Sequence, residues 1–339
     1  MINVANRYFS LNQTLLIIIG LWPYKKSKCD VIQIKDLMKE LHHIYNNLRD
    51  NDEIAIVERY GSNGIYYTTG LTIFITSAIF VFVGIQFWAS FKHTVTSNLS
   101  YSHQLLIDSE YFVDKEKYFY LIFLHINMII VIGFTTILAT GSMLIVYLQH
   151  ACGMFKIASY RIKKAIQICN SIPKNVKVKN TILIHNGLVC AVDIHRKAMI
   201  FSNYLISSFE MSFMFLIVVG VLALSLNIFR IFQIVLLEFN LYKFFINLVF
   251  ASSCFVYMFM ANFVGQQIID HNNHVFATAY KAQWYKTSVY IQRLIIILLQ
   301  RGNKNFGLRV GGLFIASIEC FATLFNASMS YFTLMYSVR

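Results

Sequence analysis

Charged residues are scarce in this chain of 339 residues, and proline is almost missing. Asp, Glu, Lys and Arg make up 13% of the sequence, against about 25% in a typical soluble domain. There are two prolines, while hydrophobic residues supply 57% and aromatic residues 16%. So rich an apolar content excludes a disordered chain, and so little charge excludes a water-soluble one. The composition therefore indicates a membrane protein.

Closely spaced cysteine pairs and enzyme motifs are missing as well. HExxH, GxSxG, P-loop and Gly-rich dinucleotide patterns do not occur, so we expect neither an enzyme nor a bound cofactor. Asp270, His271 and His274 could suggest a metal, but they directly follow an apolar window, which favours a solvated loop without metal. No zinc or disulfide spacing is visible, so we interpret the cysteines as reduced. The six are Cys29, Cys152, Cys169, Cys190, Cys254 and Cys320.

Long windows without charge supply the candidate membrane spans. A membrane helix needs about 20 mostly apolar residues. Four windows have no charged residue, and a fifth has only Glu319. They are residues 60–91, 118–155, 211–229, 244–269 and 310–338. The sequence thus predicts an all-α, polytopic helical membrane protein with about five spanning helices and a cytoplasmic helical anchor region.

Lys and Arg are unevenly distributed between the two sides of these spans. The net charge of +13 could suggest a nucleic-acid partner. With the N-terminus in the cytoplasm, however, 23 of the 29 Lys and Arg residues lie inside and six outside. Cytoplasmic loops of membrane proteins carry such an excess. We therefore predict a cytoplasmic N-terminus and an external C-terminus, with a lipid bilayer and no nucleic acid as partner.

These signals divide the chain into ten segments. The expected order is a cytoplasmic N-terminal segment with an amphipathic helix (1–64), a transmembrane helix (65–90), an extracellular loop (91–117), a transmembrane helix (118–149), a cytoplasmic helical connection (150–204), a transmembrane helix (205–229), an extracellular loop (230–243), a transmembrane helix (244–269), a cytoplasmic anchor helix and turn (270–309) and a pore-lining transmembrane helix (310–338).

Helical periodicity and one sequon refine the connections. Apolar residues recur at three- and four-residue spacing in 31–49, and 156–170, 181–200 and 275–301 behave similarly. We expect these pieces to be cytoplasmic helices, packed together or lying free on the lipid surface. Asn98 begins an Asn-Leu-Ser sequon on the predicted outer side, a candidate glycosylation site.

The last window carries a polar stripe. Glu319, Thr323, Asn326 and Ser330 are spaced four, three and four residues apart, which places them on one helix face. A charged residue within a span usually faces a bundle interior or a water-filled cavity. The stripe therefore indicates either an aqueous path or polar residues that join helices by hydrogen bonds.

Two aliphatic residues follow on the same face. Leu334 and Val338 lie one helical turn apart near the outer end. If several copies met around an axis, these side chains would form apolar rings that can gate by dewetting.

Several motifs in the tail resemble those of a known family. They are AYKAQWY at 279–285, RLI at 293–295, LLQR at 298–301 and SYFTL at 330–334, with LWPY at 21–24 near the start. This set resembles the insect odorant receptors, and LWPY resembles receptors of ants, bees and wasps. The resemblance extends over nearly the whole chain.

The resemblance implies a fold, a partner and a function. Members have seven membrane helices, a cytoplasmic N-terminus and a cytoplasmic anchor domain, and form hetero-tetramers with an obligate co-receptor subunit. They act as odorant-gated, non-selective cation channels in the plasma membrane of olfactory neuron dendrites. By motif position, Leu334 and Val338 match the family's hydrophobic gate residues.

The resemblance also implies a pocket for a volatile small-molecule odorant in the outer half of the bundle. Gly84 and Trp88 match pocket residues of a relative, and Val81 shares their face. Weaker candidates are Tyr118 and Met128 on the second span and Phe250 on the fourth. Aromatic rings beside a small gap suit volatile apolar ligands.

The sequence departs from the family in one region. Residues 7–28 resemble the stretch before the family's first helix, and 34–64 resemble the stretch after its second. The first helix pair is therefore expected to be missing, with a gap or lipid-filled groove in its place. A non-conducting truncated subunit that competes for the co-receptor, a gustatory receptor and a transporter are the alternatives.

Overall fold

The computed structural model describes residues 50–96, 117–171, 177–237, 239–304 and 306–338, with Thr14 and Leu48. These residues form seven α-helices, a 3₁₀ turn η2 and two short strands. In chain order they are α3 (Asn51–Thr96), α4 (Phe119–Ser171), α5 (Lys177–Ser208), α6 (Glu210–Leu236), α7 (Leu241–Lys281), η2 (Trp284–Lys286), α8 (Val289–Gly302), β1 (Arg309–Val310), β2 (Phe314–Ile315) and α9 (Ile318–Ser337). The prediction of an all-α polytopic chain is confirmed.

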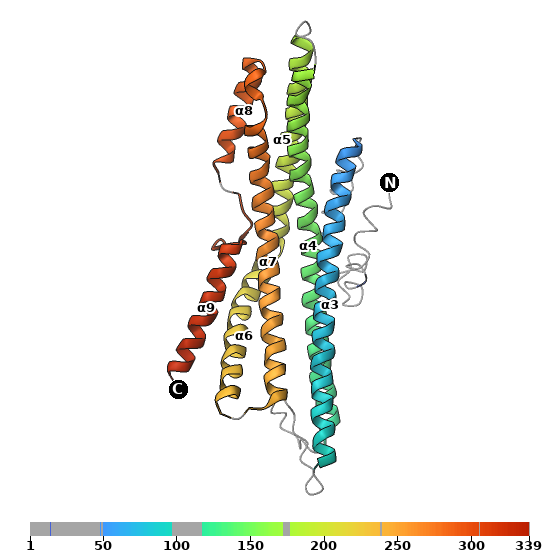
Figure 1. The fold of residues 1–339 in the computed structure, drawn as a ribbon, viewed down its shortest axis with the longest axis vertical. Coiled ribbons are helices and arrows are strands. Elements are labelled where there is room, and N and C mark those ends of the chain that lie inside the picture. Colours follow the sequence, from blue (N-terminus) through green and yellow to red (C-terminus); the bar gives the residue numbers. More distant parts are fainter. Residues whose placement is uncertain are drawn as a thin grey trace.

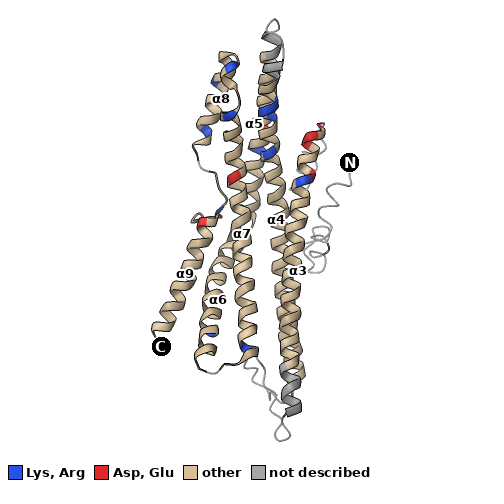
Figure 2. Cartoon of the chain, in the orientation of Figure 1, with Lys and Arg blue, Asp and Glu red and all other residues tan. Residues whose placement is uncertain are grey.

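The helices form one elongated bundle (Figure 1). α4 packs against α3, α5 and α7, while α6 packs against α7 and α9. α5 and α8 lie toward one end of the bundle, and α6 and α9 lie toward the other. Figure 2 shows most described Lys and Arg residues at the end that contains α8 and the extensions of α4 and α5. The basic residues that are unevenly distributed along the sequence are therefore gathered at one end of the bundle.

Three charge-free windows end at one level of the bundle. The Tyr60 hydroxyl on α3 lies 2.6 Å from His271 Nε2 on α7. A Cβ added to Gly153 on α4 would lie 3.4 Å from Cβ of Tyr60, so α4 passes close by. We call this the inner level, because the windows starting at residue 60 and ending at 155 and 269 all meet it.

Most of the largest buried side chains lie on α4 and α5, among them Tyr147, Phe155 and Phe201, and Phe82 of α3 is buried to the same degree. His195 of α5 stands between the rings of Phe155 on α4 and Phe276 on α7. Burial lowers the pKa of His195, and its Nε2 lies 3.0 Å from the amide oxygen of Asn272. A neutral imidazole therefore joins three helices here.

Four described helices, α3, α4, α6 and α7, are long and apolar enough to cross a membrane. The fifth expected span is not among them, because the polar stripe lowers the mean hydropathy of α9, which has 20 residues. Its expected start at 310 is wrong. Residues 309–315 form the β1–β2 hairpin instead, with Gly311 and Gly312 at positive φ, a backbone conformation that glycine adopts readily.

The expected single helix over 275–301 is also wrong. α7 ends at Lys281 and α8 begins at Val289, with η2 between them. The reversal lays the apolar face of α8 on α7, where Ile291 and Ile295 are buried with Val275 and Ala279. Apart from Leu48, the expected helix 31–49 lies outside the described residues, as do Asn98 and the residues between 28 and 34 where the first helix pair is expected to be missing.

An ion pair ties the N-terminal end of α3 to the C-terminal part of α4. Arg161 donates from Nε and Nη2 to the two carboxylate oxygens of Glu53, at 2.6 and 2.8 Å. Glu53 is buried. Two parallel hydrogen bonds fix both position and orientation of the pair.

We expect Arg161→Ala to destabilise the protein by about 3–5 kcal/mol, because it leaves a buried carboxylate without its cation. Lys197→Ala breaks an exposed pair with Asp193 and should cost about 1 kcal/mol or less. Thermal unfolding in detergent measures both. A double replacement of Glu53 and Arg161 by Met should recover most of the loss, and equal losses in the two single variants would contradict the prediction.

Candidate pore and ligand-binding sites

The polar stripe forms one exposed face of α9. Glu319, Thr323, Asn326 and Ser330 are all exposed in the single chain, as are Leu334 and Val338. The opposite side of α9 packs on α6 and α7. Leu324 and Ser328 are buried there, and Phe332 contacts the ring of Phe232 on α6. One side of α9 therefore packs against the rest of the chain, and the polar stripe faces away from it.

Side chains of α7 hold the first turn of α9. The amide oxygen of Asn262 accepts from the Ser317 N–H, and that of Gln266 accepts from the Ile318 N–H, both at 3.3 Å. The Ser317 hydroxyl accepts from the Cys320 N–H. The first N–H groups of a helix have no partner within the helix, so α7 satisfies groups that α9 cannot satisfy itself.

The orientation of both amides is determined by their second hydrogen bonds. Gln266 Nε2 donates to the Asp270 carboxylate, and Asn262 Nδ2 donates to the Met258 carbonyl, both at 2.9 Å. A carboxylate and a carbonyl accept only. The amide oxygens must therefore face α9.

Gly265 lies between these two residues, beside Ala316, which immediately precedes the N-cap of α9. A Cβ at this position would stand 2.5 Å from the Ala316 carbonyl oxygen and 2.5 Å from its Cβ. No larger residue fits without moving backbone. We call Asn262, Gly265 and Gln266 the α7 clamp.

A polar cavity of about 680 Å³ opens beside the clamp. It is bounded by α5, α6, α7, the hairpin and the start of α9. Glu210, Arg309 and Glu319 are among the residues that line it. In the sequence, Glu210 directly precedes the charge-free window 211–229. The packing of α6 makes it line the same cavity as Glu319, the first residue of the stripe.

The candidate odorant residues lie in the C-terminal half of α3 and near the N-terminal ends of α4 and α7. Val81, Trp88 and Met128 are exposed, at 47%, 61% and 51%. Tyr118 is also exposed, and a Cβ at Gly84 would meet no atom within 4 Å. The described part of the chain therefore does not enclose these residues in a pocket.

Phe250 is the exception among the candidates. Its ring contacts Phe82 on α3 and Phe134 on α4, with centroids 5.4 and 6.0 Å away. It lies where the three helices meet, and the aromatic contacts hold it between them.

Sequence reasoning missed a polar pair at the same depth. Asn127 on α4 donates to the Gln86 side chain on α3 at 3.1 Å. Its Oδ1 is buried and accepts no hydrogen bond within the described structure. A buried acceptor without a donor is costly. The available signal was Gln86 itself, an amide within a charge-free window.

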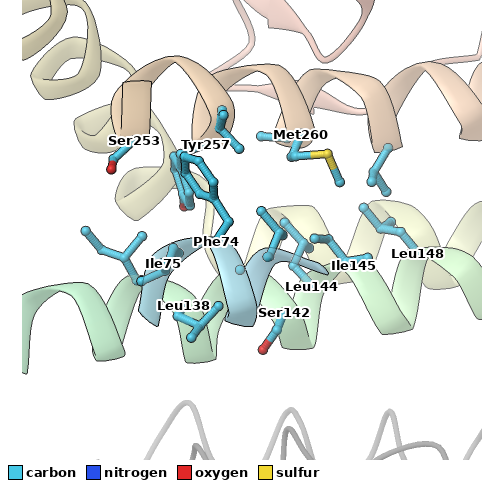
Figure 3. Close-up of a pocket in the computed structure, with 16 residues that line it drawn as sticks. Phe74, Ile75, Leu138, Ser142, Leu144, Ile145, Leu148, Ser253, Tyr257 and Met260 are labelled. Carbon is cyan, nitrogen blue, oxygen red and sulfur yellow. The ribbon is translucent and has the colours of Figure 1, made fainter. Parts of the chain in front are cut away.

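A small apolar cavity lies deeper between the same helices. It encloses about 40 Å³, little more than the space of one water molecule. Figure 3 shows Tyr257 projecting from α7 toward α3 and α4, with Ser253 and Met260 beside it. The cavity is too small for a whole ligand, so it marks a place where these helices pack loosely.

The family model described as 7tm Odorant receptor matches residues 29–329. The chain belongs to this family. It is thus a multi-pass membrane receptor of olfaction and not an enzyme. The matched family is the odorant receptors and not the gustatory receptors considered as an alternative. The comparison with curated proteins gave no match.

Two solved structures share the fold of this odorant receptor. Olfactory receptor OR5 of the insect Machilis hrabei, in complex with eugenol, has a TM-score of 0.66 and 10% sequence identity, and the alignment covers 99% of this chain and 81% of that one. A second structure of the same receptor has a TM-score of 0.61 and 12% identity, with 99% and 82% covered.

Proposed function

We propose that this odorant receptor is a subunit of a ligand-gated, non-selective cation channel that works with an obligate co-receptor in olfactory neurons. The N-terminus lies in the cytoplasm, because the basic end of the bundle faces that side. The exposed polar face of α9 carries the proposal. In a hetero-tetramer, four such faces around one axis would line a pore.

Two of the three charged residues that line the cavity beside α9 are carboxylates, and Arg309 is the third. Glu319 begins the stripe, and Glu210 lines the same cavity at its cytoplasmic end. Carboxylates at a pore mouth favour cation entry. Thr323, Asn326 and Ser330 offer oxygen atoms along the path, and Leu334 and Val338 would close it at the outer end.

The odorant site lies among the outer ends of α3, α4 and α7 in this proposal. OR5 of Machilis hrabei was solved with eugenol, a phenol. In this chain Val81, Gly84, Trp88 and Phe250 would contact the apolar body of an odorant. The unpaired Oδ1 of Asn127 would accept a hydrogen bond from its hydroxyl group.

α7 connects the two sites. Phe250 packs against α3 and α4 near one end of α7, and the α7 clamp holds α9 near the other. A helix hydrogen-bonded throughout moves as one body, so a ligand that displaces α7 displaces the start of the pore helix.

Co-expression with the co-receptor tests the function. Cells that express both subunits should give a cation current evoked by an odorant panel that begins with eugenol, whereas either subunit alone should not give that response. Whole-cell recording with sodium and potassium solutions measures the current and its selectivity. Assembly with the co-receptor but no current would contradict a conducting receptor.

That outcome would favour the competing-subunit alternative. The open surroundings of Val81, Gly84 and Trp88 are the observation behind it, since an odorant there would have few neighbours in the described structure.

We expect Leu334→Ala to raise the current in the absence of odorant, because it removes an apolar ring from the gate. Leu324→Ala is the control, since this leucine is buried on the opposite face of α9. It should lower the amount of assembled channel without raising the basal current per channel. An unchanged basal current in an otherwise active Leu334→Ala channel would refute the gate.

The α7 clamp gives a separate prediction. Gln266→Met removes one hydrogen bond to α9 at similar volume, worth about 1 kcal/mol, so the open–closed equilibrium should change about fivefold. Gly265→Ala should change it further. The ratio of basal to odorant-evoked current measures the change.

Gln267→Met is the matched control. Gln267 is hydrogen-bonded to Gln149 of α4 and to Tyr67 of α3, not to α9. Its replacement keeps both hydrogen bonds between α7 and α9, so it should change the current ratio less than Gln266→Met does. Equal effects at positions 266 and 267 would mean that general weakening of α7, and not the clamp, alters gating.

A further inference from the structure

A basic hollow lies between α3, α4 and α7 on the cytoplasmic side of the inner level. Its volume is about 540 Å³. Three lysines line it, Lys156 and Lys163 from α4 and Lys281 from the end of α7. Ser159 and Thr278 add hydroxyl groups, and no carboxylate residue lines the hollow.

The three lysines have no ionic partner within the described structure. Neighbouring acidic residues are engaged elsewhere. Asp50 pairs with Lys164, and Glu53 pairs with Arg161. Asp52 accepts a hydrogen bond of 2.7 Å from the Tyr160 hydroxyl. Asp52 keeps its negative charge beside Tyr160, which lines the hollow, so the three lysines leave the hollow with an excess of positive charge.

The hollow lies at the depth of lipid headgroups. Lys156 directly follows the charge-free window that ends at residue 155. Lys163 lies seven residues further along α4, about 10 Å at the rise of an α-helix. A headgroup layer is roughly 5–8 Å thick on each side of the hydrocarbon core. Lys281 is the twelfth residue after the window that ends at residue 269, about 18 Å along α7. The hollow thus begins in the headgroup layer and extends into the cytosol beyond it.

We propose that this hollow binds the headgroup of a cytoplasmic-leaflet lipid that carries more than one phosphate. Three ammonium groups match several phosphate charges, and the hydroxyl groups of Ser159 and Thr278 can donate to phosphate oxygens. Basic pockets between membrane helices on the cytoplasmic side bind such headgroups. A bound lipid would join α4 to the end of α7.

Binding of a fluorescent short-chain phosphatidylinositol bisphosphate to the purified full-length chain in detergent tests the proposal. Replacing Lys156, Lys163 and Lys281 together by Gln should weaken binding about 100-fold, at about fivefold for each lysine. Replacing the same three by Arg should preserve it. Phosphatidylserine, with one net charge, should bind far more weakly than the bisphosphate lipid.

The control replaces Lys117, Lys243 and Lys304 by Gln, which changes the net charge equally at exposed positions outside the hollow. It should bind as the unmodified chain does. Equal loss in both triple variants, or no loss in the first, would overturn the site. If the first triple variant aggregates, Lys281→Gln alone tests the site. Lys281 is exposed, so its replacement should not disturb folding, and lipid affinity should fall about fivefold.

Soluble inositol trisphosphate distinguishes the source of the phosphates. The lipid should bind more tightly, because its tails remain in the apolar phase while the headgroup occupies the hollow. Equal affinity for the soluble compound would overturn the assignment to a lipid.

Discussion

The rest of the structure depends on how α7 is held between two groups of helices. One side of α7 packs on α3 and α4, and another packs on α6 and α9. The close approach of Gly265 to Ala316 and the two amide caps bind α9 to α7, while Phe250, Gln267 and His271 bind α7 to α3 and α4. Movement within one group can therefore reach the other through α7.

Paired polar side chains set the register of this bundle. The bilayer core contains no water to hydrogen-bond a polar side chain, so hydrogen bonds to a neighbouring helix stabilise it there. Gln86 meets Asn127, Tyr60 meets His271, and the amides of the α7 clamp meet the backbone of α9. The stripe on α9 differs, because its residues are exposed and make no hydrogen bond to another helix among the described residues. In the proposed channel this face would line the shared conduction path.

Much of this arrangement could be predicted from the residues alone. Charge-free windows located α3, α4, α6 and α7, and helical spacing placed Glu319, Thr323, Asn326 and Ser330 on one face. The start of α9 could not be predicted, because hydropathy does not distinguish an apolar hairpin from an apolar helix. Gly311 and Gly312 were the only local signal of the turn. The break between α7 and α8 was missed because both sides of it have helical periodicity.

The sequence by itself determined three properties: the chain is a helical membrane protein, its charge is unevenly distributed, and its last helix has a polar face. These properties depend on the order of residues along one segment, and hydrophobicity and helical geometry translate them directly. Only the tertiary structure decided that Asn262 and Gln266 cap α9, that Glu210 stands near Glu319, and that three distant lysines surround one hollow. Such contacts join residues far apart in the chain, and they form only where packing makes the helices meet.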